Sequence, residues 1–202
     1  AGPAAFASRW SPAALAATHF FTLGVLTSVM CGAMFQILPV ATGVRVAGST
    51  VTATGVHLLL TLGTLGLSSA FLSTWRLLYP VSALLLAASL LWFVAACAIG
   101  LWRHRATAPK TADDVLGATR LALVALFVTV TLGVVLAFAL RWPARLAPAS
   151  LTDLHAMWGL AGWVGLLTIG MAYQLIPMFL VTEIYPRALT RVLAPTLVAL
   201  LA

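Results

Sequence analysis

The chain has 202 residues, of which 62% are hydrophobic and only 7% are charged. A soluble domain carries roughly 25% charged residues, so this composition excludes a domain covered by water and indicates a surface that faces lipid. The net charge of +7 does not indicate nucleic-acid binding, because the 11 Lys and Arg residues are scattered among short loops and helix ends and form no basic stripe. We therefore expect the lipid bilayer, and no nucleic acid, as a partner.

The pattern of apolar residues predicts a polytopic all-α membrane protein. Backbone polar groups in a bilayer must be hydrogen-bonded within the protein, which leaves helices or closed barrels. The apolar runs of this chain are long and continuous and do not alternate with polar residues, so helices are favoured. Within one transmembrane domain over residues 1–202 we expect five full transmembrane helices and a truncated sixth: about 12–41, 52–74, 80–102, 114–140, 150–182, and from 189 onward.

Several helix ends and connections follow from local sequence. Ser11 followed by Pro12 is typical of the start of a helix. The segment from Arg103 to Ala112 is expected to be the most polar loop, and turns are expected over 142–148 and 183–186. The sixth helix reaches only from 189 to 202, which is shorter than the roughly 20 residues that a crossing takes. We therefore expect the chain to be a fragment of a larger protein.

The basic residues predict an orientation in the membrane. Lys and Arg gather in the cytoplasmic connections of membrane proteins. The opposite side of this chain has four of them, whereas the side with the first, third and fifth connections has seven: Arg45, Arg103, Arg105, Lys110, Arg120, Arg187 and Arg191. The latter side is expected to be cytoplasmic, which places the N-terminus of the chain outside.

The first and fifth predicted helices resemble each other, which predicts an internal repeat with an offset of four helices. Residues 32–39 and 170–177 share the spacing Gly-x-x-x-Gln-x-x-Pro. A histidine precedes each copy, about one turn from the outer end of its helix: His19 and His155. Because an offset of four helices keeps the copies parallel, we expect both histidines at a similar depth near the outer face. In each Gln-x-x-Pro the glutamine amide either hydrogen-bonds the backbone carbonyl that the proline leaves free, or contacts a ligand. The sequence does not decide between these two roles.

The two histidines are the strongest candidate functional residues, because an ionisable side chain inside a membrane helix is costly. His19 and His155 are expected to bind one haem iron from its two sides, or one metal ion each, while an acceptor holds the second ring nitrogen. Two interhelical hydrogen bonds are the alternative. Gly159 and Gly162 lie on the His155 face and leave room for a flat cofactor or for a closely packed helix.

The other two histidines are weaker candidates. His57 lies in the second turn of its predicted helix and heads a polar line with Thr61, Thr64 and Ser68. This line suits helix packing better than a proton-accessible path, and His57 is the less favoured metal ligand. His104 lies between two arginines in the polar loop and is expected to be solvated or to face lipid headgroups.

The residues from His19 to Gly43 also carry a family resemblance. His-x4-Gly followed by Gly-Ala-x-x-Gln-x-x-Pro-Val-x-x-Gly resembles stand-alone relatives of the haem-copper oxidase catalytic subunit and the NnrS family of haem- and copper-containing membrane proteins. The resemblance implies the second to seventh helices of a roughly twelve-helix parent in a bacterial inner (cytoplasmic) membrane. It also implies a low-spin haem ligand at His19 and an active-site copper position at His155. The chain lacks the His-Pro-Glu motif of the oxidases, so a complete oxygen-reduction cycle is not implied.

The expected function is therefore that of a haem-binding membrane protein with haem b, and with copper as a second cofactor candidate. Its role would lie in electron transfer, nitric oxide chemistry, or the handling of metal or haem, and oxidoreductase activity stays open. Two alternatives remain: a transporter or channel built from repeats, and a structural subunit of a larger membrane complex or homo-oligomer.

Overall fold

The computed structural model describes residues 7–106, 112–141 and 149–202, and each regular element in these ranges is helical. In chain order the elements are α1 (Pro12–His19), η2 (Phe20–Thr27), α2 (Ser28–Thr42), α3 (Ser49–Leu72), α4 (Leu78–Arg103), α5 (Asp113–Arg141), α6 (Ala149–Met157), η4 (Trp158–Gly165), α7 (Leu166–Leu180) and α8 (Arg187–Leu201). Here η marks a segment of π-helix. The segments α1, η2 and α2 form one continuous helix, as do α6, η4 and α7, so the described residues form six helices.

Five of the six helices are long and apolar enough to cross a membrane: Pro12–Thr42, Ser49–Leu72, Leu78–Arg103, Asp113–Arg141 and Ala149–Leu180. The predicted all-α membrane fold is thereby confirmed, and each of the five agrees with its predicted span to within a few residues. The predicted start of the first helix is confirmed as well, because Ser11 Oγ accepts a hydrogen bond from the backbone N–H of Ala14 at 3.2 Å. The turn predicted over 142–148 and part of the predicted polar loop, 107–111, lie outside the described residues.

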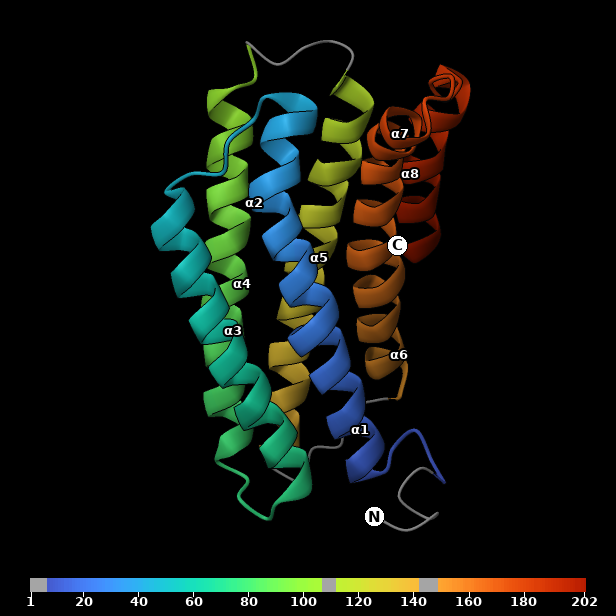
Figure 1. Ribbon diagram of the computed structural model, residues 1–202. Coiled ribbons are helices and arrows are strands. Elements are labelled where there is room, and N and C mark those ends of the chain that lie inside the picture. Colours follow the sequence, from blue (N-terminus) through green and yellow to red (C-terminus); the bar gives the residue numbers. More distant parts are fainter. Residues whose placement is uncertain (1–6, 107–111, 142–148) are drawn as a thin grey trace.

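The helices form an elongated bundle in which successive crossings run in opposite directions (Figure 1). The pair α3 and α4 forms one flank, and the helix built from α6, η4 and α7 forms the other flank together with α8. The first crossing and α5 lie between the two flanks. This arrangement brings the first and fifth crossings next to each other at the end of the bundle where both begin.

Small side chains allow the helices to approach closely. A Cβ added at Gly63 of α3 would lie 2.7 Å from Leu86 Cγ of α4, which no real packing tolerates without movement. One hydroxyl joins the same two helices, because Ser89 Oγ donates to the backbone carbonyl of Val56 at 2.8 Å. Membrane helices associate through such small residues and interhelical hydrogen bonds, since lipid tails supply no hydrophobic driving force between helices.

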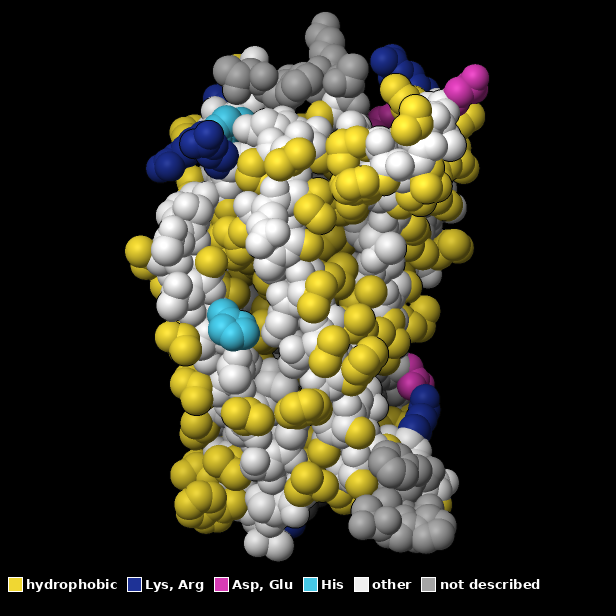
Figure 2. All heavy atoms as spheres, in the orientation of Figure 1, with side chains coloured by type: hydrophobic (Ala, Val, Ile, Leu, Met, Phe, Trp, Pro, Cys, Tyr) yellow, Lys and Arg dark blue, Asp and Glu magenta, His cyan; other side chains and the backbone are white. Residues whose placement is uncertain are grey.

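The surface has the polarity expected of a membrane protein. Figure 2 shows hydrophobic side chains along the whole visible length of the bundle, while Lys, Arg, Asp and Glu gather toward its two ends. Many large apolar side chains are exposed, among them Val40, Phe179 and Leu200. The fold is therefore that of a helical integral membrane protein, and the apolar surface between its two charged ends suits a lipid bilayer.

Candidate functional site

His19 and His155 lie next to each other in the folded chain. The centroids of their imidazole rings are 6.3 Å apart, and the ring planes differ by 16°. His19 is the last residue of α1, and His155 lies in α6. The similar depth predicted for the two histidines is thus confirmed by their direct proximity, and both side chains are half-buried.

The same ring nitrogen of each histidine is held by a backbone carbonyl. His19 Nδ1 lies 2.8 Å from the carbonyl oxygen of Leu15, one turn earlier in its own helix. His155 Nδ1 lies 3.1 Å from the carbonyl oxygen of Thr129, on the neighbouring helix α5. Because a carbonyl only accepts, Nδ1 carries the proton in each neutral ring, and Nε2 keeps its lone pair. Metal-binding histidines show this arrangement, in which the second nitrogen donates to a carbonyl that fixes the ring.

A π-helical segment follows each histidine. The segment η2 (Phe20–Thr27) begins directly after His19, and η4 (Trp158–Gly165) begins three residues after His155. π-Helices are rare and occur often at functional sites, because the wider turn changes which side chains face inward. The predicted internal repeat stays a prediction, but these two segments single out the helices that carry the histidine pair.

Two residues of α5 shape the position of His155, and the sequence analysis did not identify either. Thr129 supplies the carbonyl oxygen, and Gly133 lies against the imidazole: a Cβ added there would be 3.0 Å from His155 Cε1 and 3.6 Å from Nδ1. The spacing Thr129-x-x-x-Gly133 is the small-x-x-x-small pattern of close helix contacts. This spacing would have identified Thr129 and Gly133 if the helix that packs against α5 had been known.

The two glycines predicted to leave room beside His155 also face α5. A Cβ added at Gly159 would lie 3.3 Å from Thr129 Cγ2, and one added at Gly162 would lie 2.8 Å from the Cβ of Ala125. Their absent side chains let the fifth crossing approach α5, and this approach brings His155 within reach of the Thr129 carbonyl. A cofactor contact at Gly159 or Gly162 stays a prediction.

Aromatic residues form the wall on the other side of His19. The ring of Phe71, at the end of α3, lies 5.2 Å from the His19 ring at a tilt of 34°. Tyr79 of α4 packs edge-on against Phe71 with a centroid distance of 5.5 Å. The histidine pair is therefore bounded by an apolar, well-packed surface on the α3–α4 side.

An exposed ion pair joins the ends of the two histidine-bearing helices. Arg9 Nη1 lies 2.9 Å from Asp153 Oδ1, two residues before His155. Both side chains are largely exposed, so the pair contributes at most about 1 kcal/mol. Its location shows that the segment before α1 continues alongside α6 at this end of the bundle.

The donor set suits a metal that needs only two protein ligands. In residues 7–106, 112–141 and 149–202, His, Cys, Asp and Glu form no cluster of three or more that could hold a metal ion. Two imidazoles are enough for a haem iron, whose other four ligands come from the porphyrin. The residues present therefore fit a bis-histidine centre.

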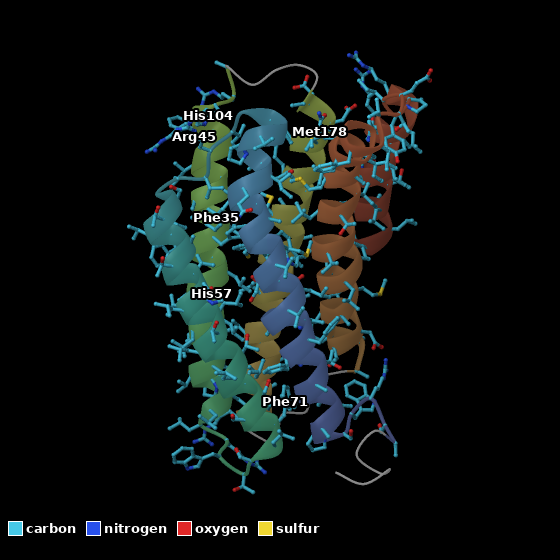
Figure 3. The ribbon with its side chains drawn as sticks, in the orientation of Figure 1. Phe35, Arg45, His57, Phe71, His104 and Met178 are labelled. Carbon is cyan, nitrogen blue, oxygen red and sulfur yellow. The ribbon has the colours of Figure 1, made fainter. Side chains whose placement is uncertain are left out.

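The other histidines lie away from this pair. His57 is exposed on α3 and, in Figure 3, lies well up the helix from Phe71, the α3 residue that contacts His19. Phe71 comes fourteen positions after His57, which corresponds to about 21 Å of helix. His104 lies near the opposite end of the bundle, with Nδ1 2.9 Å from the carbonyl oxygen of Gly100. The structure therefore brings together His19 and His155 alone among the four histidines.

The fold and the histidine pair define a class: a helical integral membrane protein in which two adjacent crossings place one imidazole each beside the other. Comparison with known proteins adds no family to this class. No protein-family model matches the chain, and neither a curated protein nor a solved structure matches it.

Proposed function

We propose that the chain is a haem-binding membrane protein in which His19 and His155 are the two axial ligands of one haem b. The observation that carries the proposal is the pairing of two near-parallel imidazole rings at 6.3 Å, each with Nδ1 fixed by a carbonyl. A hydrogen bond of this kind makes the opposite nitrogen a better ligand and fixes the direction in which it points. The resemblance to haem- and copper-containing membrane proteins supports a haem ligand at His19, whereas at His155 it implies copper.

Electron transfer is the role that this ligand set supports best. Haem supplies a one-electron couple, and its potential depends on the axial ligands, their hydrogen bonds and burial. When two protein side chains occupy both axial positions, neither position is open to oxygen or nitric oxide. The half-buried location among helices keeps water away from the two imidazoles. We therefore favour electron transfer over nitric oxide chemistry and over metal or haem handling.

A copper ion is the second cofactor candidate. Imidazole suits copper as well as iron, and a pair of histidines without a third protein ligand fits a monovalent ion with two ligands. In that case His19 and His155 would use the same Nε2 atoms, and the carbonyls of Leu15 and Thr129 would hold the rings in the same way.

A transporter or channel is supported less well. Transporter sites cluster at helix breaks near the middle of the bilayer, whereas Pro39 and Pro177 each lie in the last turn of their helix, α2 and α7. Neither Gln36 nor Gln174 makes a side-chain hydrogen bond within the described part of the chain. A structural subunit of a larger complex would not need two histidines with their Nδ1 atoms fixed.

The test is a visible absorption spectrum of the purified protein, with iron and copper analysis of the same sample. We expect a Soret band, about one haem per chain, and loss of the band in His19→Ala and in His155→Ala. His57→Ala and His104→Ala are matched controls that remove a histidine elsewhere and should keep the band. Copper at one ion per chain without a Soret band would select the second candidate. A protein with neither group, or one whose spectrum survives both His19→Ala and His155→Ala, would overturn the proposal.

A further inference from the structure

A groove on the outside of the bundle, away from the histidine pair, contains two arginines that pair with no carboxylate among residues 7–106, 112–141 and 149–202. The groove lies between α4 and α5 and has a volume of about 520 Å³. Apolar side chains line most of it, including Leu101 and Trp102 of α4 and Val124 and Phe127 of α5. Arg105 and Arg120 complete the lining, and both are exposed.

Arg120 is unusual because it lies inside a crossing. It comes seven residues after the start of α5, which corresponds to about 10 Å along the helix axis. A charged side chain at such a depth is costly unless it meets an opposite charge or reaches the headgroup layer. In the described part of the chain, no carboxylate lies within salt-bridge distance of Arg120 or Arg105. The groove therefore offers two positive charges that the protein itself does not neutralise.

The groove has the shape and polarity of a lipid site. Its α4 side extends from Trp102 down to Val94, a length of about 12 Å along the helix, which accommodates a large part of an acyl chain. Trp102 lies at the charged end, where the Arg105 guanidinium covers its ring at 4.9 Å from the ring centroid. Tryptophan is enriched at the boundary between hydrocarbon and headgroups, so the charged end of the groove coincides with the level at which lipid phosphates lie.

From this charge complementarity we propose that the groove binds one anionic glycerophospholipid. Arg105 and Arg120 hold its phosphate, and one acyl chain lies along Leu101, Val124 and Phe127. Basic pockets between transmembrane helices bind anionic headgroups in this way. The arginine fork matches phosphate oxygens in a two-point contact that a lysine does not reproduce. This inference does not depend on the function proposed for His19 and His155.

The test uses native mass spectrometry of the whole chain in detergent, with added phosphatidylglycerol or with phosphatidylcholine of the same acyl chains. We expect phosphatidylglycerol to be retained in preference to phosphatidylcholine. Because a basic residue near the membrane surface is worth about fivefold in binding, Arg105→Gln and Arg120→Gln should each lower the retained fraction about fivefold. The double variant should lower it about 25-fold. Arg103→Gln is the matched control, since Arg103 lies at the same end of α4 but does not line the groove.

Two further variants test the geometry and keep the proposal falsifiable if a glutamine variant folds poorly. Arg120→Lys keeps the charge but loses the two-point contact, so it should retain more lipid than Arg120→Gln and less than the wild type. Val124→Trp fills the groove and should lower retention while both arginines remain. Equal binding of the two lipids would overturn the proposal, as would an effect of Arg103→Gln as large as that of Arg120→Gln. A dimer in the wild type that Arg105→Gln or Val124→Trp converts to monomer would also overturn it, because a second copy would then occupy the groove.

Discussion

His155 of α6 reaches across to α5, where its Nδ1 lies 3.1 Å from the backbone carbonyl oxygen of Thr129. This acceptor is part of the main chain, so its position depends on how closely the two helices approach. Gly133 and Gly159 allow that approach, since an added Cβ at either would lie within 3.3 Å of a side-chain atom of the other helix. The ring orientation of His155 is thus determined by helix packing.

The first prediction concerns the space beside this ring. In Gly133→Ala the new Cβ would lie 3.0 Å from His155 Cε1, so the imidazole must move by a few tenths of an ångström. The movement lengthens the hydrogen bond to Thr129 and misaligns Nε2. We expect a shifted or weakened Soret band in the purified protein and less bound metal per chain.

Gly117→Ala is the matched control for this change. Gly117 lies on the same helix, and a Cβ added there meets no atom within 4 Å. The substitution should leave the spectrum unchanged and raise helix stability by up to about 1 kcal/mol, because alanine is the better helix former. If Gly133→Ala behaved like Gly117→Ala in both spectrum and stability, the packing role assigned to Gly133 would be wrong.

The positions of the membrane helices could be predicted from the sequence because lipid imposes a simple rule. An uninterrupted apolar stretch of sufficient length must become a helix when no water is present to bond its backbone. The same reasoning placed His19 and His155 at a similar depth, since the similarity of their helices and an even number of intervening crossings imply the same direction. The similar depth of the two histidines could therefore be predicted without knowledge of helix packing, whereas their direct proximity depends on which crossings are neighbours.

The residues that orient the rings were less accessible to sequence reasoning. Gly133 stands in an apolar run whose sequence does not indicate which neighbour it faces, and the role of Thr129 belongs to its carbonyl, which every residue possesses. The π-helical segments after His19 and His155 were also missed, because a π-helical turn has no characteristic amino-acid composition. Gly159 and Gly162 were predicted on the His155 face, with room for a cofactor or for a closely packed helix, and both lie against α5, as the His155 ring does. That contact depends on the rotation of the fifth crossing about its axis.

The second prediction tests a close contact between the fifth crossing and α5. In Gly162→Ala the new Cβ would lie 2.8 Å from the Cβ of Ala125, so the two helices must separate. We expect a loss of about 1–3 kcal/mol in unfolding free energy, measured by thermal or detergent-induced unfolding. Gly32→Ala, where a Cβ meets no atom within 4 Å, should lose nothing.

A compensating change makes this prediction specific. Ala125→Gly restores the space that Gly162→Ala removes, although glycine in a helix costs about 1 kcal/mol by itself. The double variant should therefore be more stable than the sum of the two single losses implies. Strict additivity would mean that the two residues are not in contact.

The third prediction concerns the wall of the histidine site. Phe71 is buried and lies between His19 and Tyr79. Removing its ring in Phe71→Ala leaves a cavity that costs about 3 kcal/mol and frees the His19 imidazole to turn about its χ angles. We expect lower unfolding stability together with a broadened Soret band. Leu72→Ala removes the neighbouring side chain, which is 66% exposed, and should change neither. A normal spectrum in a destabilised Phe71→Ala would limit Phe71 to a structural role.

The last prediction concerns the attachment of α8. Thr190 in the first turn of α8 donates a hydrogen bond to Asp114 Oδ2 of α5 at 2.6 Å, and Thr190 is buried. A hydrogen bond to a charged group contributes about 1.5–3 kcal/mol, and losing one partner leaves the carboxylate poorly solvated. Thr190→Val keeps the shape of the side chain but removes the hydroxyl. We expect α8 to detach more often, which faster hydrogen exchange of the amides in Arg187–Leu201 would report.

Thr196→Val alters an exposed threonine of the same helix and should exchange like the wild type. Equal exchange in the two variants would show that packing of Ala194 and Leu201, and not the Thr190–Asp114 bond, holds α8 to the bundle.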